Sequence, residues 1–139
     1  MTENSNMKAI KNFFETCSLL KNGKINVDYL KDDINSYSID QTPSNPIVKK
    51  YTDGGCRKQV TFDFSVQAPL SSSAIINLAN SKFCEDFTKW VEEQDKKGNL
   101  PDIPGIVQVK CTSSGYLLQK TETTAIYIIQ MNCQYDEEF

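Results

Sequence analysis

The sequence contains no histidine, so it lacks the commonest general base, the usual partner of a serine or cysteine nucleophile and the commonest metal ligand. Its cysteines are five, an odd number, and no two stand at the short spacing of a zinc site. They are Cys17, Cys56, Cys84, Cys111 and Cys133. These absences predict reduced, mostly buried thiols, and they predict a non-enzymatic protein with no catalytic residues, no metal site and no cofactor.

Long apolar runs and an excess of basic charge are also missing. The longest apolar stretch is only a few residues, which is too short for a membrane-spanning helix. The N-terminal residues lack the basic-then-apolar order of a signal peptide, so we expect synthesis to end in the cytoplasm. The formal net charge of −3 disfavours nucleic acid as a specific partner. We therefore expect neither a membrane nor a specific nucleic acid among the partners.

Adjacent carboxylates and a glycine pair do not change this expectation. The carboxylates at 32–33, 92–93 and 136–138 fall in a turn, on an exposed helix face and near the C-terminal end, where charged residues are ordinarily solvated. Gly54-Gly55 precedes a strand pattern, whereas a phosphate-binding loop opens a helix. We interpret the glycine pair as a tight turn.

The most regular pattern lies at 71–100, where apolar residues recur at steps of three and four, as on one face of a helix. The stripe consists of Ile75, Ile76, Leu78, Ala79, Phe83, Phe87, Trp90 and Val91. Gly98 follows it and suits a left-handed C-cap. Helix propensity falls at Asn80-Ser81, so two abutting helices are an alternative. A first helix is predicted from Asn4 or Ser5 to about Leu20.

Strand patterns surround this helix. Alternation predicts strands at 24–30, 37–40, 56–67, 106–112, 115–120 and 123–136, with the last two forming a hairpin. The sequence therefore predicts an α+β fold, with helices packed on a mainly antiparallel, mixed sheet in a single domain over 1–139. The expected core lies between helix and sheet. It comprises Phe62, Phe64, Phe83, Phe87, Trp90, Ile128 and either Tyr127 or Ile129.

The segment at 41–55 differs from the rest because its prolines exclude a helix and a central strand. We predict an extended arm over the surface that gains little by folding onto its own domain. Apolar residues at its centre and basic residues at its rim are typical of a contact surface. The candidate subunit or tube contact comprises Pro43, Pro46, Ile47, Val48, Lys49, Lys50, Tyr51 and Arg57.

Five stretches together resemble a known family over nearly the whole chain. They are KINVDYL, YSIDQTPSNPIVKKYTDGG, FCEDFTKWVEEQDKKGNLP, SSGYLL and TAIYIIQMNCQY. They are similar to small tail proteins of phages and phage-tail-like bacteriocins of Gram-positive bacteria, often labelled minor capsid proteins, which resemble tail terminators or tail completion proteins. The resemblance implies a tail-terminator-like fold and no catalytic residues.

The resemblance also implies a role and partners. A structural protein of this kind, made in the bacterial cytoplasm and assembled into the particle, would form a hexameric ring of identical subunits. The ring would cap and terminate the tail tube or sheath and, in true phages, join a head-completion or collar protein. A monomeric, non-enzymatic adaptor or connector in the same particle is the alternative. Whether the particle has a head, and whether its tail contracts, stays open.

Overall fold

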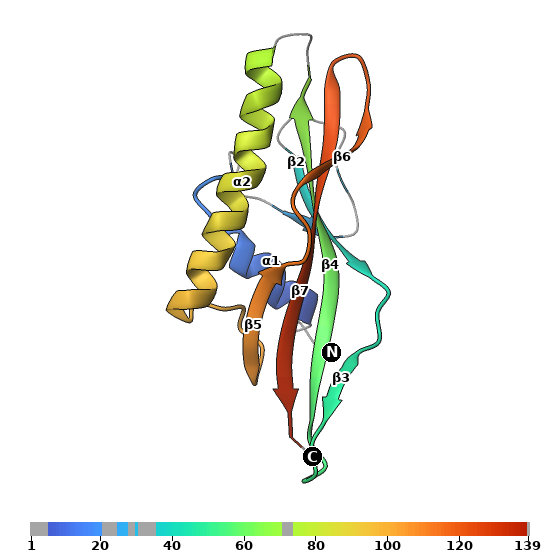
Figure 1. Cartoon of the computed structure of the whole chain (residues 1–139), viewed down its shortest axis with the longest axis vertical. Coiled ribbons are helices and arrows are strands. Elements are labelled where there is room, and N and C mark those ends of the chain that lie inside the picture. Colours follow the sequence, from blue (N-terminus) through green and yellow to red (C-terminus); the bar gives the residue numbers. More distant parts are fainter. Residues whose placement is uncertain (1–5, 21–24, 28–29, 31–35, 71–73, 139) are drawn as a thin grey trace.

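The computed structural model describes residues 6–20, 25–27, 30, 36–70 and 74–138, and places two helices and seven strands among them. Figure 1 shows these elements in an elongated molecule. Their bounds are α1 Asn6–Phe14, β1 Asn26–Val27, β2 Ser36–Thr42, β3 Ile47–Lys50, β4 Cys56–Pro69, α2 Ala74–Lys97, β5 Ile106–Cys111, β6 Tyr116–Lys120 and β7 Thr124–Glu137.

A ribbon of two long antiparallel strands, β4 and β7, forms the centre of the sheet. They pair along their full length, from Cys56 opposite Glu137 to Pro69 opposite Thr124. Shorter strands flank this ribbon at its two ends: β2 and β6 at one, β3 and β5 at the other. Only the pairing of β1 with β2 is parallel among the described strands. The predicted α+β fold with a mainly antiparallel, mixed sheet is confirmed.

Both helices pack on the same face of the ribbon. Alternation along β4 turns Val60, Phe62, Phe64 and Val66 toward them, and all four are buried. The Phe64 and Phe87 rings stack with centroids 4.3 Å apart, and Phe14 of α1 lies 5.7 Å from Phe87. This aromatic cluster joins α1, α2 and β4 into one core.

Helix α2 is continuous, so the alternative of two abutting helices is wrong. At the predicted break, the Asn80 side chain donates a hydrogen bond to the Pro69 carbonyl (2.6 Å) and is buried. The buried face runs through Asn80, Cys84, Phe87 and Val91. Ile75 and Leu78, expected in the stripe, are 80% and 67% exposed, because their positions lie on the outer side of the helix. Gly98 has a φ of 78° and caps the helix as predicted.

Two other expectations need correction. Helix α1 ends at Phe14 rather than near Leu20, because the next residues form tight turns in which Thr16 bonds to the Phe13 carbonyl through both its amide and its hydroxyl. Ile128 is buried but is not part of the core cluster, since strand alternation places it on the opposite face from Tyr127 and Ile129.

The six predicted strands agree with the structure in position and differ in length, whereas β3 was not predicted as a strand. Strand β2 extends two residues beyond the predicted end, and β4 continues to Pro69. Only Asn26–Val27 forms the described part of the strand predicted at 24–30. The first-helix cap at Asn4 or Ser5 and the carboxylates at 32–33 lie outside the described residues. No helix in the described part of the chain is long and apolar enough to span a membrane.

Candidate functional site

The predicted arm at 41–55 is a β-hairpin branch of the sheet rather than a detached surface segment. Gln41 and Thr42 belong to β2, and the residues from Ile47 to Lys50 form β3, which pairs antiparallel with β4. The expectation that the arm gains little by folding onto its own domain is therefore wrong. Pro43 and Pro46 lie outside β3, so its amides remain available for pairing, and the Pro46 carbonyl accepts a bond from the Gln59 amide (2.9 Å).

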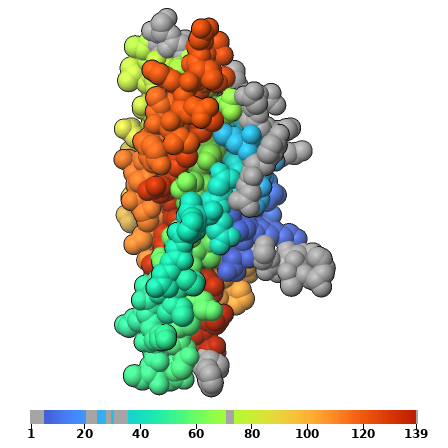
Figure 2. Space-filling model, turned by 90° about the vertical axis from the view of Figure 1, so that its right-hand side faces the viewer, coloured from blue at the N-terminus to red at the C-terminus, as the bar shows by residue number. Residues whose placement is uncertain are grey.

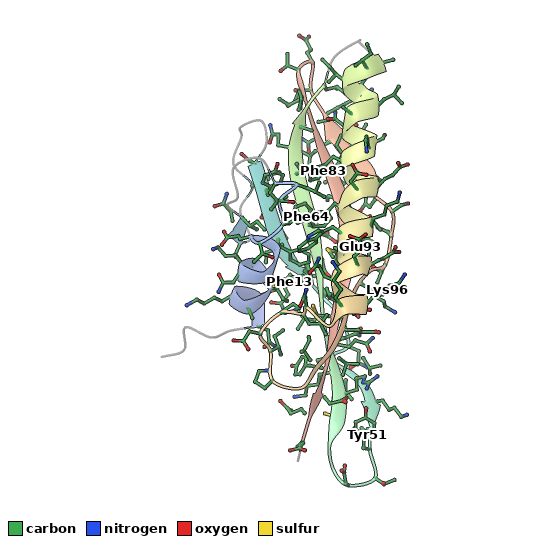
Figure 3. All side chains as sticks on the ribbon, turned by 90° about the vertical axis from the view of Figure 1, so that its left-hand side faces the viewer. Phe13, Tyr51, Phe64, Phe83, Glu93 and Lys96 are labelled. Carbon is green, nitrogen blue, oxygen red and sulfur yellow. The ribbon has the colours of Figure 1, made fainter. Side chains whose placement is uncertain are left out.

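This β3–β4 hairpin extends beyond the helices. Figure 3 shows Tyr51 near its tip, well past the end of α2 marked by Lys96. Every residue of β3 is exposed, including the apolar Ile47 (36%) and Val48 (45%). A strand buried on one face would alternate between buried and exposed residues. The hairpin is thus accessible from both sides.

Polar contacts hold the hairpin to β7 in place of an apolar core. The Asp136 carboxylate accepts hydrogen bonds from the Tyr51 hydroxyl (2.9 Å) and from Arg57 Nε (2.9 Å) and Nη2 (3.3 Å). The bonds from Arg57 and then Tyr51 hold the pKa of Asp136 below its usual value, and the bond to Asp136 raises the pKa of Tyr51. One carboxylate on β7 therefore orients two of the predicted contact residues.

The hairpin tip is a tight turn, as predicted for the Gly54-Gly55 pair. The Tyr51 amide donates to the Gly55 carbonyl (2.8 Å), and Asp53 Oδ1 accepts from the Gly55 amide (3.0 Å). Gly54 has a φ of 95°, which side-chain-bearing residues rarely adopt. The turn and the Asp136 contacts give the tip a defined conformation.

Two lysines of β3 remain as unpaired charges. Lys49 and Lys50 are exposed and have no ion pair among the described residues; Lys49 Nζ lies 5.7 Å from the centre of the Tyr51 ring. Beside them, Arg57 is paired with Asp136 and Lys58 with Glu137 (2.6 Å). The structure thus places Ile47, Val48 and these lysines together on one exposed strand. Pro43 and Pro46 are exposed next to it.

A second exposed strand, β6, was not among the predicted contacts. Its five residues are all exposed, and Tyr116, Leu117 and Leu118 are 39%, 42% and 55% accessible. Figure 2 shows β6 residues on the upper surface and β3 residues on the lower surface of the same side. Three consecutive apolar residues in a short strand cannot all face one core, and this break in alternation was the available signal.

The sheet face away from the helices holds a carboxylate pair. Asp40 and Asp63 are directly opposite on β2 and β4, and Asp40 accepts bonds from the hydroxyls of Ser38 (2.9 Å) and Ser65 (3.3 Å). Burial, and then the nearby Asp40 charge, raise the pKa of Asp63. No group of three or more potential metal ligands occurs in the part of the chain that the structure describes.

The geometry is therefore that of an ordered, projecting hairpin with an apolar and cationic strand at its edge, together with a second exposed strand at the other end of the ribbon. No protein-family model matches the sequence, and no curated protein matches it.

Proposed function

We propose that this protein is a structural subunit of a phage tail or tail-like particle, a tail terminator that assembles with copies of itself into a ring on the end of the tail tube or sheath. The resemblance in the sequence motivates the choice of particle. Its partners would be further copies of the chain, the tube or sheath protein and, in a particle with a head, a head-completion or collar protein.

The observation that carries the proposal is the two-sided exposure of the β3–β4 hairpin. A hairpin that projects beyond the helix-covered core exposes the backbone amides and carbonyls of its outer strand. It also exposes the side chains of Ile47 and Val48 to another molecule. Unpaired strand edges of this kind readily pair with other chains. Its internal contacts with Asp136 keep it ordered before binding, which lowers the entropy lost on assembly.

The proposal is tested first by mass in solution. A ring sediments at several times the 15.7 kDa of the chain, and the ring fraction rises with concentration. Sedimentation velocity combined with negative-stain imaging measures both properties. A protein that stays monomeric at its highest soluble concentration, and also in the presence of purified tail tubes, would refute the ring and leave the monomeric adaptor.

Substitution is a sharper second test than deletion. Thr42 pairs with Thr61 and Lys49 with Arg57, so removing 43–48 would force two distant points of the sheet together. The double variant Ile47→Ser and Val48→Ser keeps the backbone and changes only exposed groups. We expect it to fold normally and to lose tail termination. The matched control, Ile75→Ser and Leu78→Ser, changes two exposed apolar residues on α2.

A further inference from the structure

The sheet has two short edge strands with complementary positions. Among the described residues, β3 pairs only with β4, and β6 pairs only with β7. They therefore lie on opposite edges of the β4–β7 ribbon. They also lie at opposite ends, because β3 joins the first residues of β4 whereas β6 joins the first residues of β7. Each has one edge without a strand partner in the described part of the chain.

From this arrangement we infer that β3 of one copy pairs antiparallel with the exposed edge of β6 of another copy, extending the sheet across the subunit boundary. This inference rests on the proposed self-assembly and names the two surfaces that meet. Strand addition of this kind uses backbone hydrogen bonds for affinity and side chains for specificity. Since every copy carries both strands, the same contact can join each subunit to the next.

Apolar side chains match in this pairing. Ile47 and Val48 of β3 would lie beside Leu117 and Leu118 of β6, and all four are exposed in the single chain. Cross-strand apolar contacts stabilise a strand pair once water is excluded. Both strands would then lose exposed apolar surface in one contact.

Charge selects the antiparallel direction. In a parallel pair, Lys49 and Lys50 would run beside Lys120 at the end of β6, and like charges side by side are unfavourable. In an antiparallel pair they point instead to the start of β6, at Tyr116. The two directions therefore place the lysines at opposite ends of the same strand.

A groove of about 610 Å³ lies at that end, between α2 and the residues that precede β6. Ser114 and Gly115 form one wall, and Glu85, Lys89 and Glu92 of α2 contribute to the other. Gly115 permits the close approach, because a Cβ there would lie 2.6 Å from Cys84 Sγ. Neither Glu85 nor Glu92 has an ion pair among the described residues, and together they outnumber Lys89. Because consecutive strand residues point to opposite faces, the groove suits the ammonium group of whichever of Lys49 and Lys50 faces α2 of the second copy.

The test uses charge reversal on each side separately. One variant carries Lys49→Glu and Lys50→Glu, and the other carries Glu85→Lys and Glu92→Lys. Each alone places like charges across the contact and should remain monomeric in sedimentation velocity under conditions in which the unmodified chain assembles. An equimolar mixture restores opposite charges at every contact and should assemble again. Circular dichroism confirms that each variant is folded.

Matched controls separate this contact from net charge. The variants Lys96→Glu with Lys97→Glu, and Glu93→Lys with Asp102→Lys, make the same charge changes at exposed positions outside the groove. Both should assemble like the unmodified chain. If the unmodified chain assembles but the mixture does not, the inference is wrong and the proposed function stands. If the mixture and the unmodified chain form only dimers, the strand pairing stands and the ring is wrong. If the unmodified chain never assembles, the strand pairing and the ring are both wrong.

A photo-cross-link gives an independent readout. Benzoylphenylalanine at position 48 should form products between copies that map to 114–118 of the second chain. Products confined to another region of the chain, or to the tube protein alone in assembled particles, would overturn the pairing even if the charge variants fail to assemble.

Discussion

The two ends of the β4–β7 ribbon are stabilised by different interactions. Toward one end, helices cover one face, and Phe64 and Phe87 stack without solvent exposure. At the other, β3 is exposed on both sides, and a carboxylate, a tyrosine and an arginine fix the hairpin. Apolar burial supplies most of the free energy of folding, whereas exposed ion pairs contribute little. The first region can therefore determine stability while the second remains free to bind.

The largest expected effect is in the covered region. Phe87→Ala removes a fully buried ring and should lower the free energy of unfolding by about 3–5 kcal/mol. Urea denaturation followed by circular dichroism measures the change. Ile75→Ala, on the exposed side of the same helix, is the control and should change stability by less than about 0.5 kcal/mol. Equal losses for the two variants would contradict the assigned face of α2.

Trp90 provides a case between buried Phe87 and exposed Ile75, because its side chain packs on the core but is only partly buried. It lies 5.3 Å from Phe13 and 6.2 Å from Phe87 between ring centres. Trp90→Ala should therefore cost less than Phe87→Ala in the same denaturation experiment, because the space left at a partly exposed site is open to water, whereas Phe87→Ala leaves an enclosed cavity. A larger loss would show that α1 depends on this residue for docking.

The next effect concerns two glycines with the same backbone conformation. Gly98 and Gly105 both have a φ of 78°. A Cβ at Gly98 would meet no atom within 4 Å, whereas one at Gly105 would collide with the Asp136 backbone carbonyl. Gly105→Ala should cost about 2–4 kcal/mol, from backbone strain plus displacement of β7. Gly98→Ala should cost about 1–2 kcal/mol, from strain alone. Thermal unfolding distinguishes these outcomes.

Sequence reasoning identified the covered region better than the exposed one. Alternation in β4 determines which side chains enter the core, because successive residues of a strand face opposite ways. The same rule places Ile128 on the opposite face from Ile129 and so excludes it from the cluster, although its apolar side chain alone suggests a core position. For α2, apolar residues at helical spacing indicated a wider stripe than the sheet covers, so Ile75 and Leu78 were misplaced. A pattern shows which residues can be buried, and the partner surface determines which are.

The conformation of the hairpin depends on side-chain contacts between residues that are distant in the sequence. Prolines at 43 and 46 correctly excluded a helix, but the hairpin is fixed by Asp136, which is 85 residues from Tyr51 in the chain. In the sequence, Asp136 belongs to an acidic run that reads as solvated surface. Long-range pairs of this kind leave no local pattern, which is why the sequence predicts Tyr51 and Arg57 as contact residues and gives no sign of their bonds to Asp136.

A smaller, local effect is expected from Asp136→Asn, which weakens the attraction to Arg57. The hairpin should open more often, so amides at 47–58 should exchange faster with deuterium while the melting temperature hardly changes. Glu138→Gln, an exposed neutralisation two residues away, is the control. Unchanged exchange at 47–58 would show that strand pairing alone holds the hairpin.

The same contacts predict a pH dependence of hairpin exchange. The folded pKa of Asp136 is lowered, so its contribution is present above the unfolded value, about 4, and disappears as pH falls through the folded pKa. The folded pKa of Tyr51 is raised, so its contribution is present below about 10 and disappears as pH rises through the folded pKa. Protection of the hairpin, corrected for intrinsic exchange, should be constant between these limits.

Thiol alkylation tests the difference between the helix-covered region and the hairpin with the smallest expected effect on stability. All five cysteines are unpaired in the structure, as predicted. Burial raises the pKa of Cys133 to about 12 and the pKa of Cys84 and of Cys111 to about 11. Cys56 lies next to the turn at the tip of the hairpin, opposite Lys50, and is only partly buried. Because the thiolate is the reactive form, iodoacetamide should modify Cys56 first and Cys133 last.

Mass spectrometry of peptides over time measures this order, and denatured protein, in which the five thiols should react at similar rates, is the control. Asp136→Asn should speed the reaction of Cys56 and leave that of Cys133 unchanged, since the substitution opens the hairpin without loosening the core. If both thiols accelerate together, the hairpin and the covered region unfold as one unit. The exposed end could not then move independently of the core, and its freedom to adapt to a partner would be lost.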